Sequence, residues 1–210
     1  MRRALAVLLL LGLVACGDDG DGDGDQGEAQ PGTTSTTSAT TTAPSTTTTV
    51  APEDESPVGV PTRGPLETAG FPQSTAPLVH LVEVRVAGQP GFDRVVFQLD
   101  GPVPAYRIEY VEEAVADGSG EPVAVRGGAL LQVTMTPASG VDLTGADPEE
   151  IYTGPARFDA EGTAFVDELV RTGDFEGVLT WVIGVSEEVD VGVAVLEDPA
   201  RLVIDLLEPE

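Results

Sequence analysis

Strict alternation of apolar and polar residues is the feature that most constrains this chain, and it runs through the part after residue 77. Val82, Val84 and Val86 alternate with Glu83 and Arg85. The same period of two recurs in residues 94–99, 106–110, 131–135, 179–185 and 202–206. A period of two places successive side chains on opposite faces of a strand, whereas a helix requires a period near 3.6. Short segments of this kind, separated by Gly, Pro and Asp, predict an all-β domain.

The number of these segments predicts a two-sheet β-sandwich. Together with the Val-rich run 189–196 they make about seven to eight strands in about 130 residues, which is enough for one buried core. Two antiparallel sheets packed face to face bury such strands. Residues 88–91 supply a turn that joins the first two strands as a hairpin. Residues 165–172 fit either two helical turns or a strand that pairs with 178–185, and we favour the strand.

The first fifteen residues predict a cleaved export signal that ends in a lipidation site. Arg2 and Arg3 precede the apolar run 4–15, which at ~1.5 Å per residue is too short to span ~30 Å of hydrocarbon. Leu13-Val14-Ala15-Cys16 resembles the bacterial lipobox, in which the cysteine carries the lipid and becomes the first residue of the mature protein. Cys16 is the only cysteine in the chain. We therefore expect a lipoprotein anchored on the extracytoplasmic face of the cell membrane.

A long low-complexity segment separates Cys16 from the alternating part. Residues 18–28 are acidic and Gly-rich, residues 33–50 are almost entirely Thr, Ser and Ala, and prolines follow up to Pro77. None of these stretches has an apolar face that could offset the entropy of ordering the backbone. The expected organisation is a signal peptide over 1–15, a lipidated cysteine and disordered linker over 16–77, and the sandwich over 78–210. Glycosylation of the Thr-rich stretch and docking of Phe71 on the domain stay open.

Charge and residue counts exclude several functions. The chain has 10 basic residues, 36 acidic residues and a net charge of −26, whereas nucleic-acid phosphates require clustered Lys or Arg. One Cys and one His cannot form an internal disulfide or most zinc sites, so we expect no metal and no cofactor. The one histidine, His80, is the only candidate His base, and a packing role at its strand start is favoured. We expect no catalysis.

Four residues are candidates for a binding surface. Asp93 and Arg94 lie at the start of a strand, and Arg201 precedes the last one. An arginine fork suits the carboxylates of peptide stems or of another protein; the alternative is that each Arg pairs with a neighbouring acid on a solvated face. Tyr152, in a loop flanked by Gly and Pro, is the aromatic residue that we expect to be exposed. Trp181 lies on the apolar side of its strand and is expected in the core.

Three stretches carry a resemblance to a known family. Residues 91–104 (GFDRVVFQLDGPVP), 173–181 (GDFEGVLTW) and 199–206 (PARLVIDL) resemble the AMIN family and, more closely, the AMIN-like domain of actinobacterial lipoproteins. The resemblance covers residues 78–207. It implies a β-sandwich that serves as a non-catalytic module and places its host on peptidoglycan or in an envelope assembly.

Two functions follow from these observations. The first is a membrane-tethered lipoprotein whose sandwich binds peptidoglycan or a wall-associated protein. The second is a structural or protein-interaction lipoprotein without affinity for glycans. The negative charge weighs against tight binding to an anionic polymer, because like charges repel within a Debye length of ~8 Å.

Overall fold

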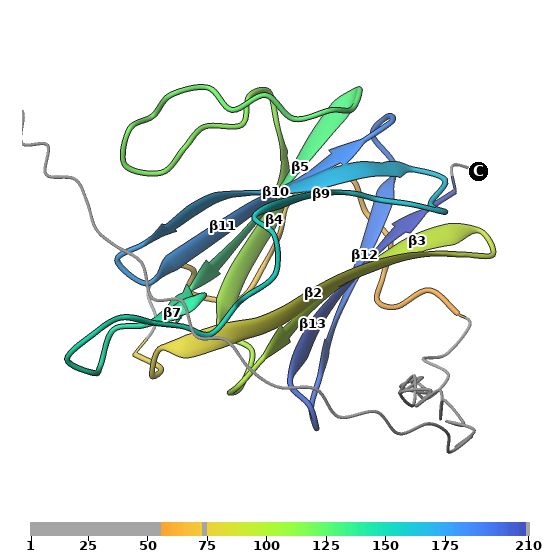
Figure 1. The fold of residues 1–210 in the computed structure, drawn as a ribbon. Helices are drawn as coiled ribbons and strands as arrows, with labels where there is room; N and C mark the ends of the chain where they lie inside the picture. Colours follow the sequence, from red (N-terminus) through yellow and green to blue (C-terminus); the bar gives the residue numbers. More distant parts are fainter. Residues whose placement is uncertain (1–55, 73–74, 209–210) are drawn as a thin grey trace, which may run out of the picture. The chain divides into compact units, whose positions relative to one another are not determined.

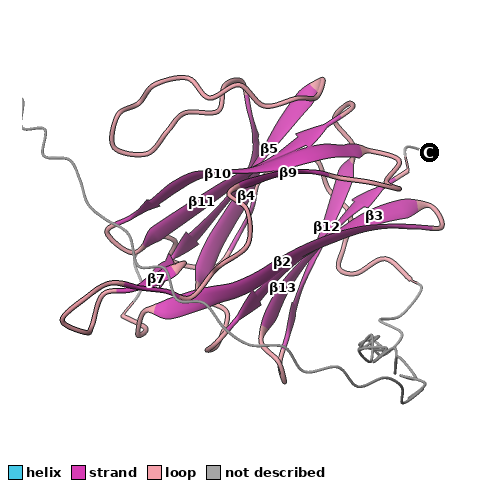
Figure 2. Cartoon of the chain, in the orientation of Figure 1, coloured by secondary structure: helices cyan, strands magenta, loops and turns pink. Residues whose placement is uncertain are grey.

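The computed structural model describes residues 56–72 and 75–208, and this part of the chain is built from strands and loops (Figures 1 and 2). Eight strands have seven residues or more: β2 (Val79–Gln89), β3 (Phe92–Leu99), β4 (Ala105–Val111), β5 (Ala129–Thr136), β10 (Val166–Phe175), β11 (Val178–Val185), β12 (Asp190–Leu196) and β13 (Arg201–Leu207). Five are short: β1 (Leu66–Glu67), β6 (Ala138–Ser139), β7 (Val141–Asp142), β8 (Glu149–Glu150) and β9 (Arg157–Asp159). No helix with the length and apolarity needed to cross a membrane occurs in the described residues.

Two main sheets face each other, as the sandwich prediction requires (Figure 1). One has the strand order β1-β4-β5-β11-β10-β9 and the other the order β12-β13-β3-β2-β6. All neighbours are antiparallel except β2 and β6, which are parallel. The all-β fold is confirmed, and so is the strand expected within 165–172, because β10 pairs with β11 along its length.

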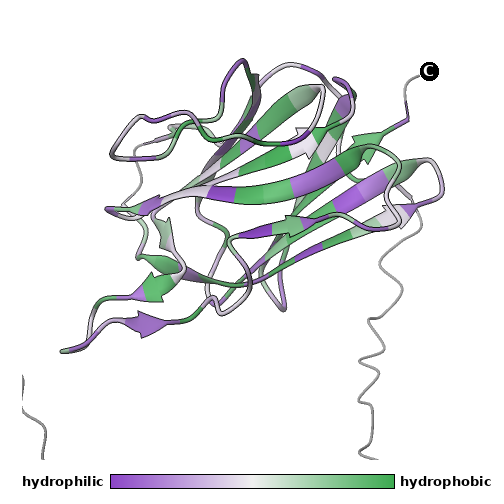
Figure 3. Cartoon of the chain, turned by 45° about the horizontal axis from the view of Figure 1, so that its top comes forward, coloured by the Kyte–Doolittle hydropathy of each residue, from purple (hydrophilic) through white to green (hydrophobic). Residues whose placement is uncertain are grey.

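The core lies between the inner faces of the two sheets, and apolar and polar residues alternate along the strands (Figure 3). Trp181 on β11 is fully buried, as its position in the alternation predicted. Its ring makes edge contacts with Phe97, Tyr152 and Phe158, at centroid distances of 6.0, 5.6 and 6.3 Å. Aromatic pairs prefer this edge-to-face geometry, so Trp181 ties both sheets and the loop before β9 to one centre.

A β-bulge changes the pattern at the start of β2. The register shifts between Leu81, which pairs with Leu99, and Glu83, which pairs with Gln98. Leu81 is fully buried, whereas the side chain of Val82 is 39% exposed. The expectation that Val82 shares the inward face of Val84 is therefore wrong, because the extra residue of a bulge interrupts the alternation.

Residues 56–72, which we call the strap, lie against the sandwich (Figure 1, the start of the coloured chain). The Val58 N–H donates to Asp205 Oδ2 at 2.7 Å. Thr62 forms an antiparallel bridge with Val191 of β12, and Leu66–Glu67 pairs with β4. The strap thus hydrogen-bonds to an outer strand of each sheet and closes one side of the sandwich.

The strap also answers the open question about Phe71, because the guanidinium of Arg107 on β4 lies 4.9 Å from the centre of its ring. The expected linker over 16–77 therefore includes a stretch that bonds to the domain. The expected signal peptide, Cys16 and the Thr-rich stretch lie outside the described residues.

Candidate functional site

Asp93, a predicted binding residue, has a structural role. Its side chain is fully buried on β3. Its carboxylate accepts hydrogen bonds from the backbone N–H groups of Ala164, Phe165 and Val166, at 2.6 to 3.0 Å. A carboxylate with several N–H donors is well satisfied in the interior, and here it fixes the loop that enters β10. The expectation that Asp93 lies on a recognition surface is wrong.

Arg94, the next residue, is 6% exposed and also unavailable to a partner. Its Nε and Nη2 donate to the two carboxylate oxygens of Asp205, each at 2.7 Å. Nη2 also donates to the Ser56 carbonyl at 3.0 Å. Arg94 precedes the core residue Val95 and faces away from the core, but the strap covers it. The pair therefore lies in the interior and not on the solvated face that the alternative described.

Arg201 is separate from Arg94. Its side chain is partly exposed, and its Nε donates to the Pro199 carbonyl at 3.2 Å. Arg201 precedes Asp205, the partner of Arg94, by four residues on β13, which corresponds to roughly 13 Å along a strand. The structure does not bring the two predicted arginines into one site.

Tyr152 is 2% exposed, so the expectation of an exposed aromatic side chain is wrong. The hydroxyl donates to the Pro155 carbonyl at 3.1 Å, and burial raises the pKa of the phenol. A Cβ on Gly154 would lie 2.6 Å from the hydroxyl oxygen. The Gly and Pro that predicted a projecting loop instead let the backbone fold over the ring.

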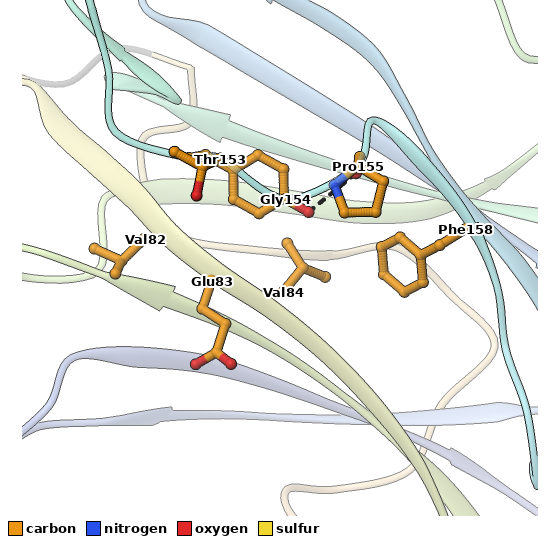
Figure 4. Close-up of a pocket in the computed structure, with 8 residues that line it drawn as sticks. Val82, Glu83, Val84, Thr153, Gly154, Pro155 and Phe158 are labelled. Carbon is orange, nitrogen blue, oxygen red and sulfur yellow. Dashed lines mark hydrogen bonds between the residues drawn. The ribbon is translucent and has the colours of Figure 1, made fainter. Parts of the chain in front are cut away.

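A groove about 450 Å³ in volume lies beside Tyr152, between β2 and residues 152–158 (Figure 4). The strap pairs with β12 and β4, whereas β2 and β9 lie at the opposite sides of the same two sheets. The groove therefore opens on the side of the sandwich that the strap does not cover. Most of the lining is apolar, and Glu83 and Thr153 add polar groups. The lining residues are Val82, Glu83, Val84, Tyr152, Thr153, Gly154, Pro155 and Phe158.

The groove was not predicted from the sequence. Its two walls, 82–84 and 152–158, lie about 70 residues apart in the chain. The bulge that exposes Val82 leaves no mark in the alternation. The one available signal was the aromatic and Gly/Pro content of 152–158, which indicated a special loop but not its orientation.

The arginines of the described part are used in pairing. Seven of them form ion pairs with Asp or Glu: Arg63, Arg85, Arg94, Arg107, Arg126, Arg157 and Arg171. The eighth, Arg201, bonds to a carbonyl. Acidic residues outnumber basic residues 36 to 10 in the whole chain. The positive charges are thus locally neutralised, and the surface of the described part has no unpaired arginine cluster that could hold a polyanion.

Glu168 on β10 is the buried centre of another ion-pair network. Its side chain is 2% exposed and accepts hydrogen bonds from Arg157 Nη1 at 2.9 Å and from the Arg126 N–H. Burial alone would raise the pKa of this carboxyl, but the hydrogen bonds and the two arginine charges outweigh it and lower the pKa. The network fastens the loop before β5 to β9 and β10.

His80 does not line the groove. Its Nδ1 lies 2.8 Å from Asp100 Oδ2, and its N–H donates to Asp100 Oδ1 at 2.6 Å. Its Nε2 is buried and has no hydrogen-bond partner in the described part of the chain. Over residues 56–72 and 75–208, no group of three or more His, Cys, Asp or Glu side chains is arranged to hold a metal ion.

Comparison with known proteins gives one match. The model of the AMIN-like domain family matches residues 79–208, which is most of the chain and nearly the span of the resemblance. The comparison with curated proteins found no match, and neither did the comparison with solved structures. The matched span begins at the first residue of β2 and ends one residue after β13, so it includes every strand except β1, and both walls of the groove. This chain belongs to the AMIN-like domain family.

Proposed function

We propose that this protein is a non-catalytic binding module of the cell envelope, and that its groove contacts peptidoglycan or a wall-associated protein. The observation that carries the proposal is the AMIN-like match over 79–208, since this domain suggests a peptidoglycan-associated module. The groove supplies the surface, because it is concave, mainly apolar and formed within the matched span.

The chemistry of the groove supports binding in preference to catalysis. Glu83 and Tyr152 are the titratable residues of its lining, and the Tyr152 hydroxyl is already donated to Pro155. Acid–base catalysis needs a donor and an acceptor positioned on the substrate. Glu83 alone, ion-paired with Arg85, does not provide such a pair.

Charge limits the kind of ligand. With a net charge of −26 and the described arginines already bonded to acids or carbonyls, the module repels anionic wall polymers at short range. A neutral glycan face or a polypeptide avoids this repulsion.

A lipid on Cys16 would hold the module at the membrane. The support is the sequence Leu13-Val14-Ala15-Cys16 at the end of an apolar run, with no second cysteine in the chain. Cys16→Ala would then move the protein from the detergent phase to an unprocessed or soluble form. Unchanged partitioning of this variant in a detergent phase separation would contradict the anchor.

Sedimentation with two wall preparations tests the binding proposal. The chain from residue 17 is mixed with insoluble wall from the host cell, either with its proteins retained or after protease and detergent have removed them. Retention in both pellets identifies peptidoglycan, and retention only with the untreated wall identifies a wall-associated protein. If the chain stays in the supernatant of both at low and physiological salt, the proposal is wrong.

A further inference from the structure

We infer that the groove accepts an extended polypeptide segment, which adds as a strand to the free edge of β2. The inference rests on the proposed function and narrows it, because it identifies the partner as a protein. It is carried by the pairing of β2, by the groove lining and by the charge of the chain.

The edge of β2 is open for part of its length. One side of β2 pairs with β3 from Leu81 to Gln89. On the other side, β6 pairs only with Val79 and His80. In the described part of the chain, residues 82–86 therefore have no hydrogen-bonded strand on that side, and we call this stretch the free edge.

Backbone groups along the free edge point away from β3. The turn at Pro90 and Gly91 has two residues, so Gln89 and Phe92 are the hydrogen-bonded pair that closes the hairpin. Because hydrogen-bonded and non-hydrogen-bonded pairs alternate in an antiparallel ladder, the N–H and C=O groups of Val84 and Val86 face outward. Neither residue makes a hydrogen bond on that side in the described part of the chain. An added strand would satisfy these groups.

The length of the free edge limits an added strand to a few residues. β6 occupies the edge at one end, and the five residues of the free edge correspond to roughly 17 Å of strand. Across the groove, Pro155 and Phe158 offer apolar contacts to every second side chain of the added segment.

Charge indicates a basic segment. Glu83 and Arg85 pair with each other at the free edge, so the attraction comes from the chain as a whole, which carries 26 negative charges in excess. A segment with Lys or Arg is attracted by this field, whereas a second copy of the chain carries the same charge and is repelled. The occupant is thus an extended segment of another protein, with apolar and basic residues in alternation.

A synthetic peptide of nine residues, with Val and Lys in alternation and both ends blocked, is the probe. Its matched control has the five central backbone amides N-methylated, which keeps every side chain and charge but removes the donors. At 0.15 M salt we expect the unmodified peptide to bind the chain from residue 17 at least tenfold more tightly. Amide hydrogen exchange should slow at Val84 and Val86, and not at Val195 on the opposite edge of the same sheet.

Three results would overturn the inference. Equal affinity for the two peptides would show attraction by charge alone, and slower exchange at Val195 but not at Val84 would place the peptide on the wrong edge. The wall sedimentation above is a separate readout. If the chain sediments with protein-free wall but does not bind the peptide, the proposed function stands and strand addition is refuted.

Discussion

Arg94 and Asp205 form a two-point ion pair on the outer face of a sheet, and yet both side chains are buried, at 7% and 0% exposure. The strap produces this burial. Its Ser56 carbonyl accepts from Arg94 and its Val58 N–H donates to Asp205. Buried charges are tolerated only as a pair, and here the strap both covers the pair and hydrogen-bonds to it. The strap is therefore part of the folded unit, although the family match begins later, at residue 79.

Replacing Arg94 tests this relationship. Arg94→Ala leaves the Asp205 carboxylate buried without its partner, so the free energy of unfolding should fall by about 3–5 kcal/mol. Equilibrium denaturation in urea measures the change. Arg201→Ala is the control, because that partly exposed side chain should contribute less than about 1 kcal/mol. If the two variants unfold at the same urea concentration, the buried pair is not the stabilising contact.

Gly192 of β12 tests the path of the strap. A Cβ at this position would lie 1.9 Å from the Val58 carbonyl oxygen, so Gly192→Ala must displace the strap, with an expected loss of about 1–3 kcal/mol. Trypsin cleavage after Arg63, within the strap, should become faster. In Gly145→Ala the nearest atom is 3.4 Å away, and cleavage should be unchanged. Equal cleavage rates in the two variants would argue against the strap.

The Glu168 network predicts a loss of stability in acid. The pKa of this carboxyl is lower in the folded chain than its ordinary value of 4.5. The unfolded state therefore binds the proton more readily, so the contribution of Glu168 is complete above pH 4.5 and is lost as pH falls through the folded pKa. Unfolding free energies measured from pH 7 to pH 3 should decline less steeply in Glu168→Gln. If the unfolding free energy declines with equal slope in both proteins, Glu168 does not cause the loss of stability in acid.

The alternation predicted the strands because it is a local property. Residues 179–185 lie in β11, and most of the ambiguous stretch 165–172 lies in β10. Which face of a strand a side chain occupies depends only on its position along that strand. The burial of Arg94 could not be predicted in this way, because the strap residue that covers it lies 38 residues earlier in the chain. Gly192, in the middle of a Val-rich run, was the available signal, since a glycine inside a strand often marks the close approach of another backbone.

The candidate site was less predictable than the fold. Tyr152 was identified as special, but its exposure depends on how residues 153–155 fold back over its ring. Val82 lines the groove because of a bulge, and a bulge depends on the pairing of two strands. Such features follow from tertiary contacts, which a single sequence shows only indirectly.

The most direct test of the account compares two valine variants in the wall sedimentation. Val82→Lys puts a positive charge into the groove, which opposes both an apolar contact and a basic segment, whereas Val195→Lys adds the same charge to the opposite edge of the same sheet; the two valines are 39% and 48% exposed, so both variants should fold. The account predicts that Val195→Lys is retained with the wall like the unchanged chain, and that retention of Val82→Lys falls at least tenfold. Equal retention of the two variants would contradict the claim that the groove is the binding site.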